Sequence, residues 1–370
     1  MPSASEMKTL DGVYDEMFSF QELYQSYLKA RRRKRFRGDV MLFTDRLEEN
    51  LAALEQELKT GTYRVRKYRR FYVSEPKLRL VMAQQFRDRV VQWAIYRQLM
   101  PFYDKMFIED SYACRLNKGS HKAADRLQYW LEQVERKPGE YYYLKLDISK
   151  YFYRVDHEIL ISILKKRVKD ERLMVLLEQI INCETENFGL PLGVSPQDIP
   201  TEDWLSDVGM PIGNLSSQLF ANIYLNELDQ YCKHELHLHF YVRYADDIII
   251  LLDSKEKLHK VKDLLKHFNK KTVIRPCRLG VDFVGYRVSA HKRKLKRHTA
   301  RHMINTIRKL TVNVMEAITE RVYLERVTAS YKGILDHCDS EGLQKLLNVI
   351  LLVQKLKFIR LHGRASPAPA

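Results

Sequence analysis

Apolar positions recur with a helical period near the start of the chain and then change to an alternating period. Leucine and aromatic side chains stand three or four residues apart around Phe20–Leu28 and again over Leu42–Leu58, so each stretch predicts an amphipathic helix. Gly61 then provides a typical C-terminal stop. From Tyr63 to Val81 apolar and basic residues alternate around Glu75-Pro76-Lys77, which predicts a hairpin with a basic face.

The middle of the chain predicts strands that carry acidic residues. Between Tyr141 and Ile148 the pattern has period two, so Lys145 and Asp147 share the face opposite the leucines. Phe240–Leu252 predicts two strands joined at Asp246-Asp247, because aromatic and β-branched residues flank a pair that tolerates turns. Helices are predicted at 88–100, 156–181, 214–228 and 253–268, a further strand or hairpin arm at 281–288, and a basic helical segment beyond 290. This mixture indicates an α+β protein.

Composition and charge narrow the class of protein. A chain of 370 residues with 45% hydrophobic residues can bury enough apolar surface to fold, with room for two or three packed units. The formal charge of +16 favours a polyanionic partner or an anionic membrane surface. Because no apolar run approaches the ~20 residues that span a bilayer and no signal core opens the chain, we expect a soluble intracellular protein without a membrane partner. The five cysteines lack zinc-site spacing, so we expect reduced thiols.

The adjacent carboxylates Asp246 and Asp247 are the strongest chemical signal. Between two apolar strands they repel each other unless a cation sits beside them, although a solvated turn is the simpler explanation of the pair alone. Asp147 ends a separate strand whose polar face can meet this hairpin. Three such carboxylates make an oxygen site suited to Mg²⁺, of the kind that two-metal nucleotidyl transfer requires.

The order of several sequence blocks resembles that of reverse transcriptases. Tyr244-Ala245-Asp246-Asp247 and Leu144–Phe152 are similar to the palm of that family, and Gly213–Asn222 and Phe283–Tyr286 occupy the expected places around them. Further blocks precede the palm in the family's order: Glu75–Arg79, Phe86–Arg89 and Ser111–Arg115. The resemblance implies a right-hand polymerase with an N-terminal basic helical extension (1–62), fingers (63–140), a palm (141–290, with a fingers-side loop at 186–210), a helical thumb (291–365) and a tail (366–370).

The resemblance also implies roles for individual residues at the reaction centre. Asp147, Asp246 and Asp247, helped by the carbonyl of Ile148, would bind two Mg²⁺ ions, with Mn²⁺ able to substitute. Phe152 falls at the steric gate that selects deoxynucleotides, with a core aromatic as its simpler explanation. The remaining nucleotide-binding positions are Lys77 and Arg79, which would grip the triphosphate, and Ile212, Gly213 and Gln218.

Other positions are implied to handle the leaving group and the nucleic acid. Gly285 and Tyr286 match the primer grip, while Lys270 or Lys271 would protonate the leaving pyrophosphate unless it is a solvated surface lysine. Basic residues predicted to contact nucleic acid are Arg31, Arg32, Arg33, Arg35, Lys292 and Arg293. The segment between Leu252 and Val281 is short for the family, so we expect that a strand at the palm edge is missing, which puts the lysine assignment in doubt.

Two departures from the usual reverse transcriptase sequence indicate the subgroup. Ile212 stands where most reverse transcriptases have Gln, and Ser217-Gln218 stands where they have Ser-Pro. With Ser111–Arg115 and Lys118–His121, this pattern resembles the enzymes of diversity-generating retroelements, which copy a template RNA with errors at adenine. That resemblance implies a bacterial or phage-encoded protein in the cytoplasm of the bacterial cell, acting on template RNA, a cDNA primer and deoxynucleoside triphosphates with a small basic accessory protein.

Several alternatives remain open. Within the family, these are retron-like, group II intron-like and phage-defence reverse transcriptases. A template-independent or protein-primed polymerase is a further possibility, as is a scaffold whose palm has lost catalysis. Retention of all three carboxylates argues against the scaffold, because a binding protein has no reason to bear their mutual repulsion.

Overall fold

The computed structural model describes residues 9–74, 78–148, 150–265, 271–313 and 318–362. It divides into two compact units, each built from two stretches of chain: residues 1–115 with 148–239, and residues 116–147 with 240–370. Both units mix helices with antiparallel strands, which confirms the predicted α+β class. The boundaries proposed for fingers, palm and thumb remain a prediction. Lys77 and Lys270 lie outside the described residues, as does the tail.

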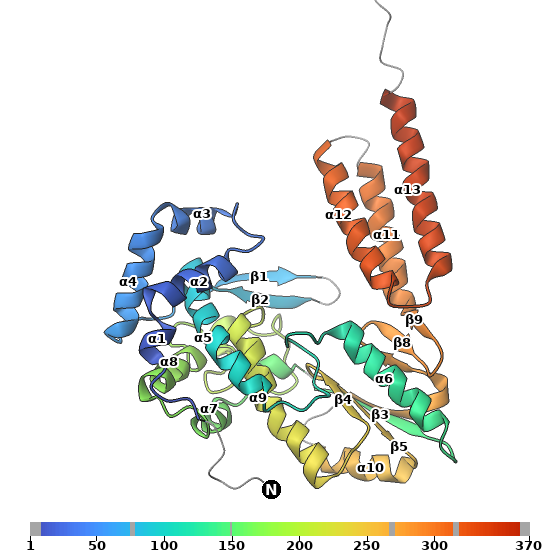
Figure 1. Cartoon of the computed structure of the whole chain (residues 1–370), viewed down its shortest axis with the longest axis horizontal. Coiled ribbons are helices and arrows are strands. Elements are labelled where there is room, and N and C mark those ends of the chain that lie inside the picture. The colour runs from blue at the N-terminus through green and yellow to red at the C-terminus, as the bar shows by residue number, and fades with distance from the viewer. Residues whose placement is uncertain (1–8, 75–77, 149, 266–270, 314–317, 363–370) are drawn as a thin grey trace, which may run out of the picture. The chain divides into compact units, whose positions relative to one another are not determined.

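The first unit is mainly helical and contains one hairpin. Helix α5 is its centre, since α2, α3 and α9 all pack against it (Figure 1). Its elements are α1 (Tyr14–Met17), α2 (Phe20–Ala30), α3 (Gly38–Asp45), α4 (Leu47–Lys59), β1 (Arg69–Val73), β2 (Arg79–Ala83), α5 (Phe86–Asp104), α7 (His157–Lys165), α8 (Glu171–Ile181) and α9 (Leu215–Gln230), with short helical turns at Tyr151–Tyr153 and Thr201–Asp203 and a π-helical turn at Tyr231–Glu235.

Two predicted helices of this unit are each divided in two. The prediction of one helix over 156–181 is wrong, because α7 ends at Lys165 and Asp170 caps the start of α8. Its carboxylate accepts a hydrogen bond from the amide of Leu173 at 3.0 Å, which fixes the start of α8. The stretch Leu42–Leu58 is likewise interrupted at Arg46, whose backbone (φ −125°, ψ 52°) leaves the helical region.

The second unit contains a four-stranded antiparallel sheet with strand order β4-β5-β3-β6. Leu144 and Ile250 are fully buried neighbours across β3 and β5, and helices α6 and α10 pack against the sheet (Figure 1). The elements of this part are α6 (Ser120–Glu135), β3 (Tyr142–Asp147), β4 (Tyr241–Tyr244), β5 (Asp247–Leu252), α10 (Lys255–Leu264) and β6 (Lys271–Pro276).

A small sheet and three helices complete the second unit. The sheet has order β7-β8-β9, with β7 (Val281–Phe283), β8 (Tyr286–Val288) and β9 (Arg293–Leu295). The helices are α11 (Arg297–Asn313), α12 (Ile318–Leu335) and α13 (Glu341–His362), and their shared core is formed by Met303, Ile307, Leu324, Leu335 and Leu347. No helix in the described part of the chain is long and apolar enough to cross a membrane.

The expectation that a strand is missing at the sheet edge is wrong. β6 pairs with β3 along its whole length, and the backbone of Lys271 stands opposite that of Asp147. A short connection suffices because α10 ends at Leu264, leaving enough chain for the return strand. The sheet therefore supports β3 from both sides.

Candidate active site

The register of the four-stranded sheet brings two of the predicted carboxylates together. Asp147, the last residue of β3, is the direct cross-strand partner of Asp247, the first residue of β5. Side chains of directly opposed residues share one face of a sheet, with Cβ atoms about 5 Å apart. Asp246 precedes Asp247 in the turn that links β4 to β5. The hairpin was predicted correctly, although the turn is formed by Ala245 and Asp246.

The turn adopts a backbone conformation that side chains usually avoid. Ala245 has φ 53°, in the left-handed region, and its carbonyl oxygen accepts a hydrogen bond from Nη1 of Arg243 at 3.1 Å. Arg243 is fully buried in β4. This contact from inside the sheet holds the turn in place and thereby the position of Asp246.

Lys145 is the main stabilising partner of Asp247. Its ammonium group donates to Oδ2 of Asp247 at 2.8 Å and to the carbonyl oxygen of Asp282 at 2.8 Å. Lys145 precedes Asp147 by two positions in β3, so the alternation of the strand places both on one face. The pattern of polar positions predicted that shared face; the ion pair was not predicted.

The surroundings of Asp247 fit a cation. Its Oδ1 is buried without a hydrogen-bond partner among the described residues. Burial, opposed by Lys145 and assisted by the charges of Asp147 and Asp246, raises the pKa of Asp247 to about 6. A bound cation would satisfy Oδ1 and offset this cost. Within the described ranges, however, no three acidic, His or Cys side chains are already arranged as a metal centre.

Lys296 is a second cation that the sequence did not single out. Burial, followed by repulsion from Lys145, lowers the pKa of Lys296, while the charges of Asp282 and Asp247 oppose this shift. Its amide donates to the carbonyl oxygen of Gly285 at 3.1 Å. Because 49 positions separate it from Asp247, only the fold reveals this proximity.

The first unit brings together three segments that carry predicted nucleotide-binding residues. The carbonyl oxygen of Phe152 accepts from the amide of Met210 at 2.6 Å, and that of Ile212 accepts from the amide of Met82, in β2, at 3.2 Å. Arg79 begins β2 and is exposed. These two backbone contacts place the hairpin, the Phe152 turn and the loop before α9 side by side.

The predicted nucleotide-binding and metal-binding residues near these contacts differ in burial and in backbone conformation. Gly213 has φ 104°, and a Cβ added there would lie 3.0 Å from Cγ1 of Val81. Phe152 is half-buried, with its ring packed edge-on against Tyr151 at 5.6 Å between centroids. Gln218 is half-buried in the first turn of α9. Ile148, whose carbonyl was predicted to help bind metal, is buried directly after Asp147.

The predicted primer grip lies in the turn between β7 and β8. Gly285 has φ 90° and Val284 has φ 41°, so both residues of the turn lie in the left-handed region that favours glycine. Tyr286 is buried, and its hydroxyl contacts Nδ1 of His121 at 3.0 Å and the carbonyl oxygen of Ile334 at 3.2 Å. Burial raises the pKa of Tyr286 to about 12.

The predicted nucleic-acid contacts differ in accessibility. Lys292 is exposed, as are Arg32, Arg33 and Arg35, whereas Arg31 is half-buried and donates to the hydroxyl of Tyr27 at 3.0 Å. Arg293 is buried and pairs with Asp125 at 2.7 Å and with Gln128 at 2.9 Å. The guanidinium of Arg293 is thus occupied by contacts within the protein.

The chain belongs to the reverse transcriptase family. The family model described as "Reverse transcriptase (RNA-dependent DNA polymerase)" matches residues 59–295, well over half of the chain and the whole region that carries the carboxylates. Together with the mixed helices and antiparallel sheets, this membership confirms the predicted right-hand polymerase fold class.

Similar proteins include bacterial ones. Protein YkfC of Escherichia coli is 32% identical over 195 residues, which cover 52% of this chain and 48% of YkfC. The group II intron-encoded protein LtrA of Lactococcus lactis is 28% identical over 189 residues, 50% of this chain and 28% of LtrA. The matched region thus spans about half the length of these curated relatives or less.

Among solved structures, the chain is similar to telomerase from Candida albicans, with a TM-score of 0.42 and 12% identity over 83% of this chain and 58% of that one. It is also similar to a chain of a partial Cas6-RT-Cas1--Cas2 complex, with a TM-score of 0.40 and 21% identity over 69% of this chain and 41% of the other.

The ion pair of Lys145 and Asp247 predicts a non-additive double-mutant cycle. Lys145→Met leaves a half-buried carboxylate without its cation, so the free energy of unfolding should fall by about 1–3 kcal/mol at pH 7. Lys145→Met/Asp247→Asn removes both charges and should recover most of that loss. Urea unfolding of the unaltered chain, the two single variants and the double variant, without divalent ions, measures these free energies. If the losses of the single variants add in the double variant, the ion pair does not stabilise the site.

Proposed function

We propose that this chain is an RNA-directed DNA polymerase that copies an RNA template into cDNA. The observation that carries the proposal is the sheet register that sets Asp147 opposite Asp247, beside the Ala245-Asp246 turn, in a member of the reverse transcriptase family. Three carboxylates gathered at strand ends carry a repulsion that a folding role would not require.

The proposed metal ligands are Asp147, Asp246, Asp247 and the carbonyl of Ile148. Two divalent ions, Mg²⁺ in the first instance and Mn²⁺ as a substitute, would supply activation of the primer 3′-oxygen and charge stabilisation of the leaving pyrophosphate. The unpartnered Oδ1 of Asp247 supports this assignment, because it is a buried acceptor that a cation would satisfy. Lys145 keeps the same carboxylate oriented through Oδ2.

The proposed nucleotide contacts are Arg79, Phe152, Ile212, Gly213 and Gln218, with Lys77 beside them in sequence. This assignment is supported by the backbone contacts between the segments of the first unit that carry Arg79, Phe152 and Ile212. The partly accessible ring of Phe152 is suited to excluding a ribose 2′-hydroxyl by bulk. Lys270 or Lys271 stays the proposed general acid, and Gly285 and Tyr286 stay the proposed primer grip.

The proposed partners are template RNA, a cDNA primer and deoxynucleoside triphosphates. The exposed side chains of Arg32, Arg33, Arg35 and Lys292 support contact with phosphates. A small basic accessory protein belongs to the finer proposal that the chain is the error-prone enzyme of a diversity-generating retroelement in a bacterial cytoplasm. Ile212 and Ser217-Gln218 favour that subgroup.

A group II intron-like enzyme is the second candidate. The observation that favours it is the similarity to LtrA, which covers 50% of this chain. The two candidates differ in the expected error pattern, because frequent errors at template adenines are expected only of the first.

The carboxylates predict a charge-dependent loss of activity. Asp246→Asn and Asp247→Asn keep the shape but remove the charge, so Mg²⁺-dependent cDNA synthesis should fall more than about a hundredfold, roughly 3 kcal/mol of transition-state stabilisation. Primer extension on an RNA template measures the effect. Asp253→Asn, at an exposed position after β5, is the matched control and should retain activity. Full activity in either site variant would refute the assignment.

Phe152 predicts a change in sugar selection. Phe152→Ala or Phe152→Val removes a repulsion, so ribonucleotide incorporation should rise about tenfold or more while deoxynucleotide use is largely kept. The ratio of kcat/KM for the two nucleotide types is the measurement, and Phe36→Ala, which truncates a ring that is 87% exposed, is the control. An unchanged ratio would make Phe152 a packing residue.

Ile212 predicts the error spectrum. Ile212→Gln should reduce misincorporation opposite template adenines by roughly one to two orders of magnitude, since it restores a polar contact that positions the nucleotide. Ile212→Leu preserves the apolar character and should leave the errors unchanged. Sequencing cDNA from one adenine-containing template compares them. Few adenine errors in the unaltered protein would favour the group II intron-like candidate.

A further inference from the structure

His157 is a buried histidine of the first unit that has no part in the proposed chemistry. It is 3% exposed and occupies the first position of α7, directly after the capping residue Asp156. Both ring nitrogens of its imidazole face oxygen atoms. Nε2 lies 2.6 Å from the carbonyl oxygen of Gly209, and Nδ1 lies 3.1 Å from Oδ1 of Asn182. The imidazole is therefore held on both sides.

The contact with Gly209 is a hydrogen bond that the histidine donates. A carbonyl oxygen only accepts, so the hydrogen of this bond sits on Nε2 of His157. Gly209 is buried, and its carbonyl would lack a compensating partner if this donor were removed. On the other side of the ring, Asn182 is an exposed residue at the C-terminal end of α8, and it orients the imidazole.

Gly209 lies in a segment that pairs with the chain carrying Phe152. The amide of Met210 donates to the carbonyl oxygen of Phe152 at 2.6 Å. The backbone amide of His157 donates to the carbonyl oxygen of Asp207 at 3.1 Å. His157 therefore contacts this segment twice, once through its backbone and once through its imidazole.

A displacement of Gly209 would reach the residues beyond it. Gly209 has φ 97°, and a Cβ there would lie 2.5 Å from a backbone carbonyl carbon of the facing chain, so the segment is tightly packed on that side. Pro211 has a fixed φ and restricts Met210 to extended conformations, which makes the next stretch stiff. This stretch leads directly to Ile212. The position of Gly209 thus bears on Ile212 as well as on Phe152.

We propose that His157 is a positioning residue for nucleotide selection. By holding the carbonyl of Gly209, its imidazole fixes the backbone that supports Phe152, and so keeps the ring of Phe152 where it excludes a ribose 2′-hydroxyl. His157 acts through the backbone and does not contact the nucleotide. The inference rests on the proposed polymerase function and adds a residue to the sugar selection assigned to Phe152.

The ratio of kcat/KM for deoxynucleotides to kcat/KM for ribonucleotides separates positioning from stability. A variant that is only less stable contains fewer active molecules, which lowers both values by the same factor. The ratio therefore changes only when the active molecules themselves have changed. Primer extension on an RNA template, at a temperature below the unfolding midpoint of every variant, measures it.

Two substitutions at His157 differ in the donor that they leave. His157→Phe keeps a ring but removes the donor to Gly209, so it should lower the ratio about fivefold, because small displacements in a binding site have large effects. His157→Gln retains an amide donor and should recover most of the ratio. Asn182→Ala frees the imidazole from an exposed position without opening a buried cavity, and should lower the ratio by less.

The effect should require the ring of Phe152. In Phe152→Ala there is no ring to position, so the addition of His157→Phe should change the ratio no further. Equal effects of His157→Phe with and without the ring would overturn the inference.

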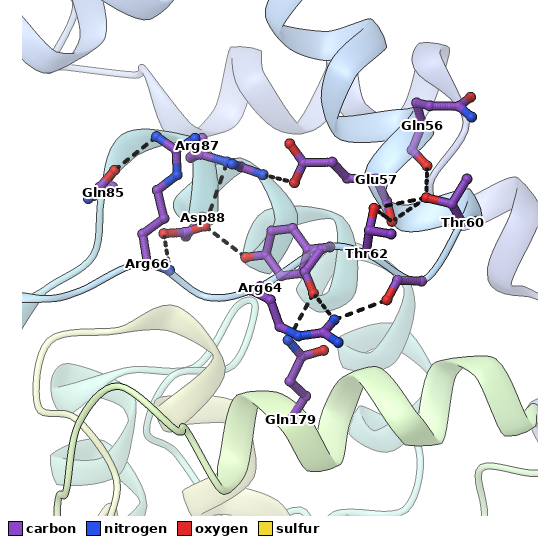
Figure 2. A network of polar contacts seen from close by, with 12 residues as sticks. Gln56, Glu57, Thr60, Thr62, Arg64, Arg66, Gln85, Arg87, Asp88 and Gln179 are labelled. Atoms are coloured by element: carbon purple, nitrogen blue, oxygen red, sulfur yellow. Dashed lines mark hydrogen bonds and ion pairs between the residues drawn. The ribbon is translucent and has the colours of Figure 1, made fainter.

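Gln179 provides the matched control. Figure 2 shows this residue of α8, whose side-chain amide donates to the backbone carbonyl oxygen of Tyr63 at 2.8 Å. Gln179→Leu removes a hydrogen bond of the same kind elsewhere in the first unit. It should leave the ratio unchanged, whatever its effect on the unfolding midpoint.

Hydrogen exchange tests the geometry without any catalysis. In His157→Phe the amides of Gly209 and Met210 should exchange about tenfold faster or more than in the unaltered chain, because the pairing of their segment is weakened locally. In His157→Gln and Gln179→Leu these amides should exchange as in the unaltered chain.

An unchanged ratio in His157→Phe, in a chain whose ratio responds to Phe152→Ala, would overturn the inference. So would unchanged exchange of Gly209 and Met210. Absence of cDNA synthesis by the unaltered chain would instead refute the proposed function, and with it the role in selection, while the exchange of these amides would still show whether His157 holds the segment.

Discussion

The repulsion among three carboxylates at the ends of β3 and β5 is the constraint on which the second unit depends. Antiparallel pairing sets Asp147 directly against Asp247, and the buried position of Asp247 intensifies the cost. The sheet bears that cost because Lys145 supplies a cation from the same strand and the apolar faces of β3 and β5 are fully buried. Burial of those faces contributes roughly 25 cal/mol per Å² of apolar surface, which opposes the repulsion among the acidic side chains.

The first unit also brings like charges together, but here the charges are positive. Cations gather beside the start of α5, where Arg87 pairs with Glu57 and Nη1 of Arg89 is buried without a hydrogen-bond partner among the described residues. In both units the fold places like charges together and leaves a buried polar atom that has no hydrogen-bond partner in the described part of the chain: Oδ1 of Asp247 in the second unit and Nη1 of Arg89 in the first. Buried groups of this kind are rare in folded proteins and are often associated with ligands, which is why Oδ1 of Asp247 is interpreted functionally.

Backbone contacts link the nucleotide-binding candidates more directly than their side chains do. The amides of Met82 and Met210 donate to Ile212 and Phe152, so the positions of these residues are set by main-chain geometry. At Gly209 a Cβ would lie 2.5 Å from the carbonyl carbon of Phe188, so only glycine permits the close approach that brings Met210 to Phe152. Side-chain identity is then free to determine selectivity, as we propose for Ile212.

Periodicity and residue order determined the α+β class, the hairpins predicted over 63–81 and 240–252, and the proposal of the carboxylates as the chemical centre, because these depend on local alternation and on motifs. The division of 156–181 into two helices depended on the cap provided by Asp170, a local signal that apolar periodicity does not register. The strand at Lys271–Pro276 depended on long-range pairing with β3, which local patterns do not encode. The partners of single side chains were likewise decided by the tertiary structure. Lys145 with Asp247, Arg293 with Asp125, and the convergence of Arg37 and Arg89 join residues that are distant in sequence, and only packing determines which of them meet.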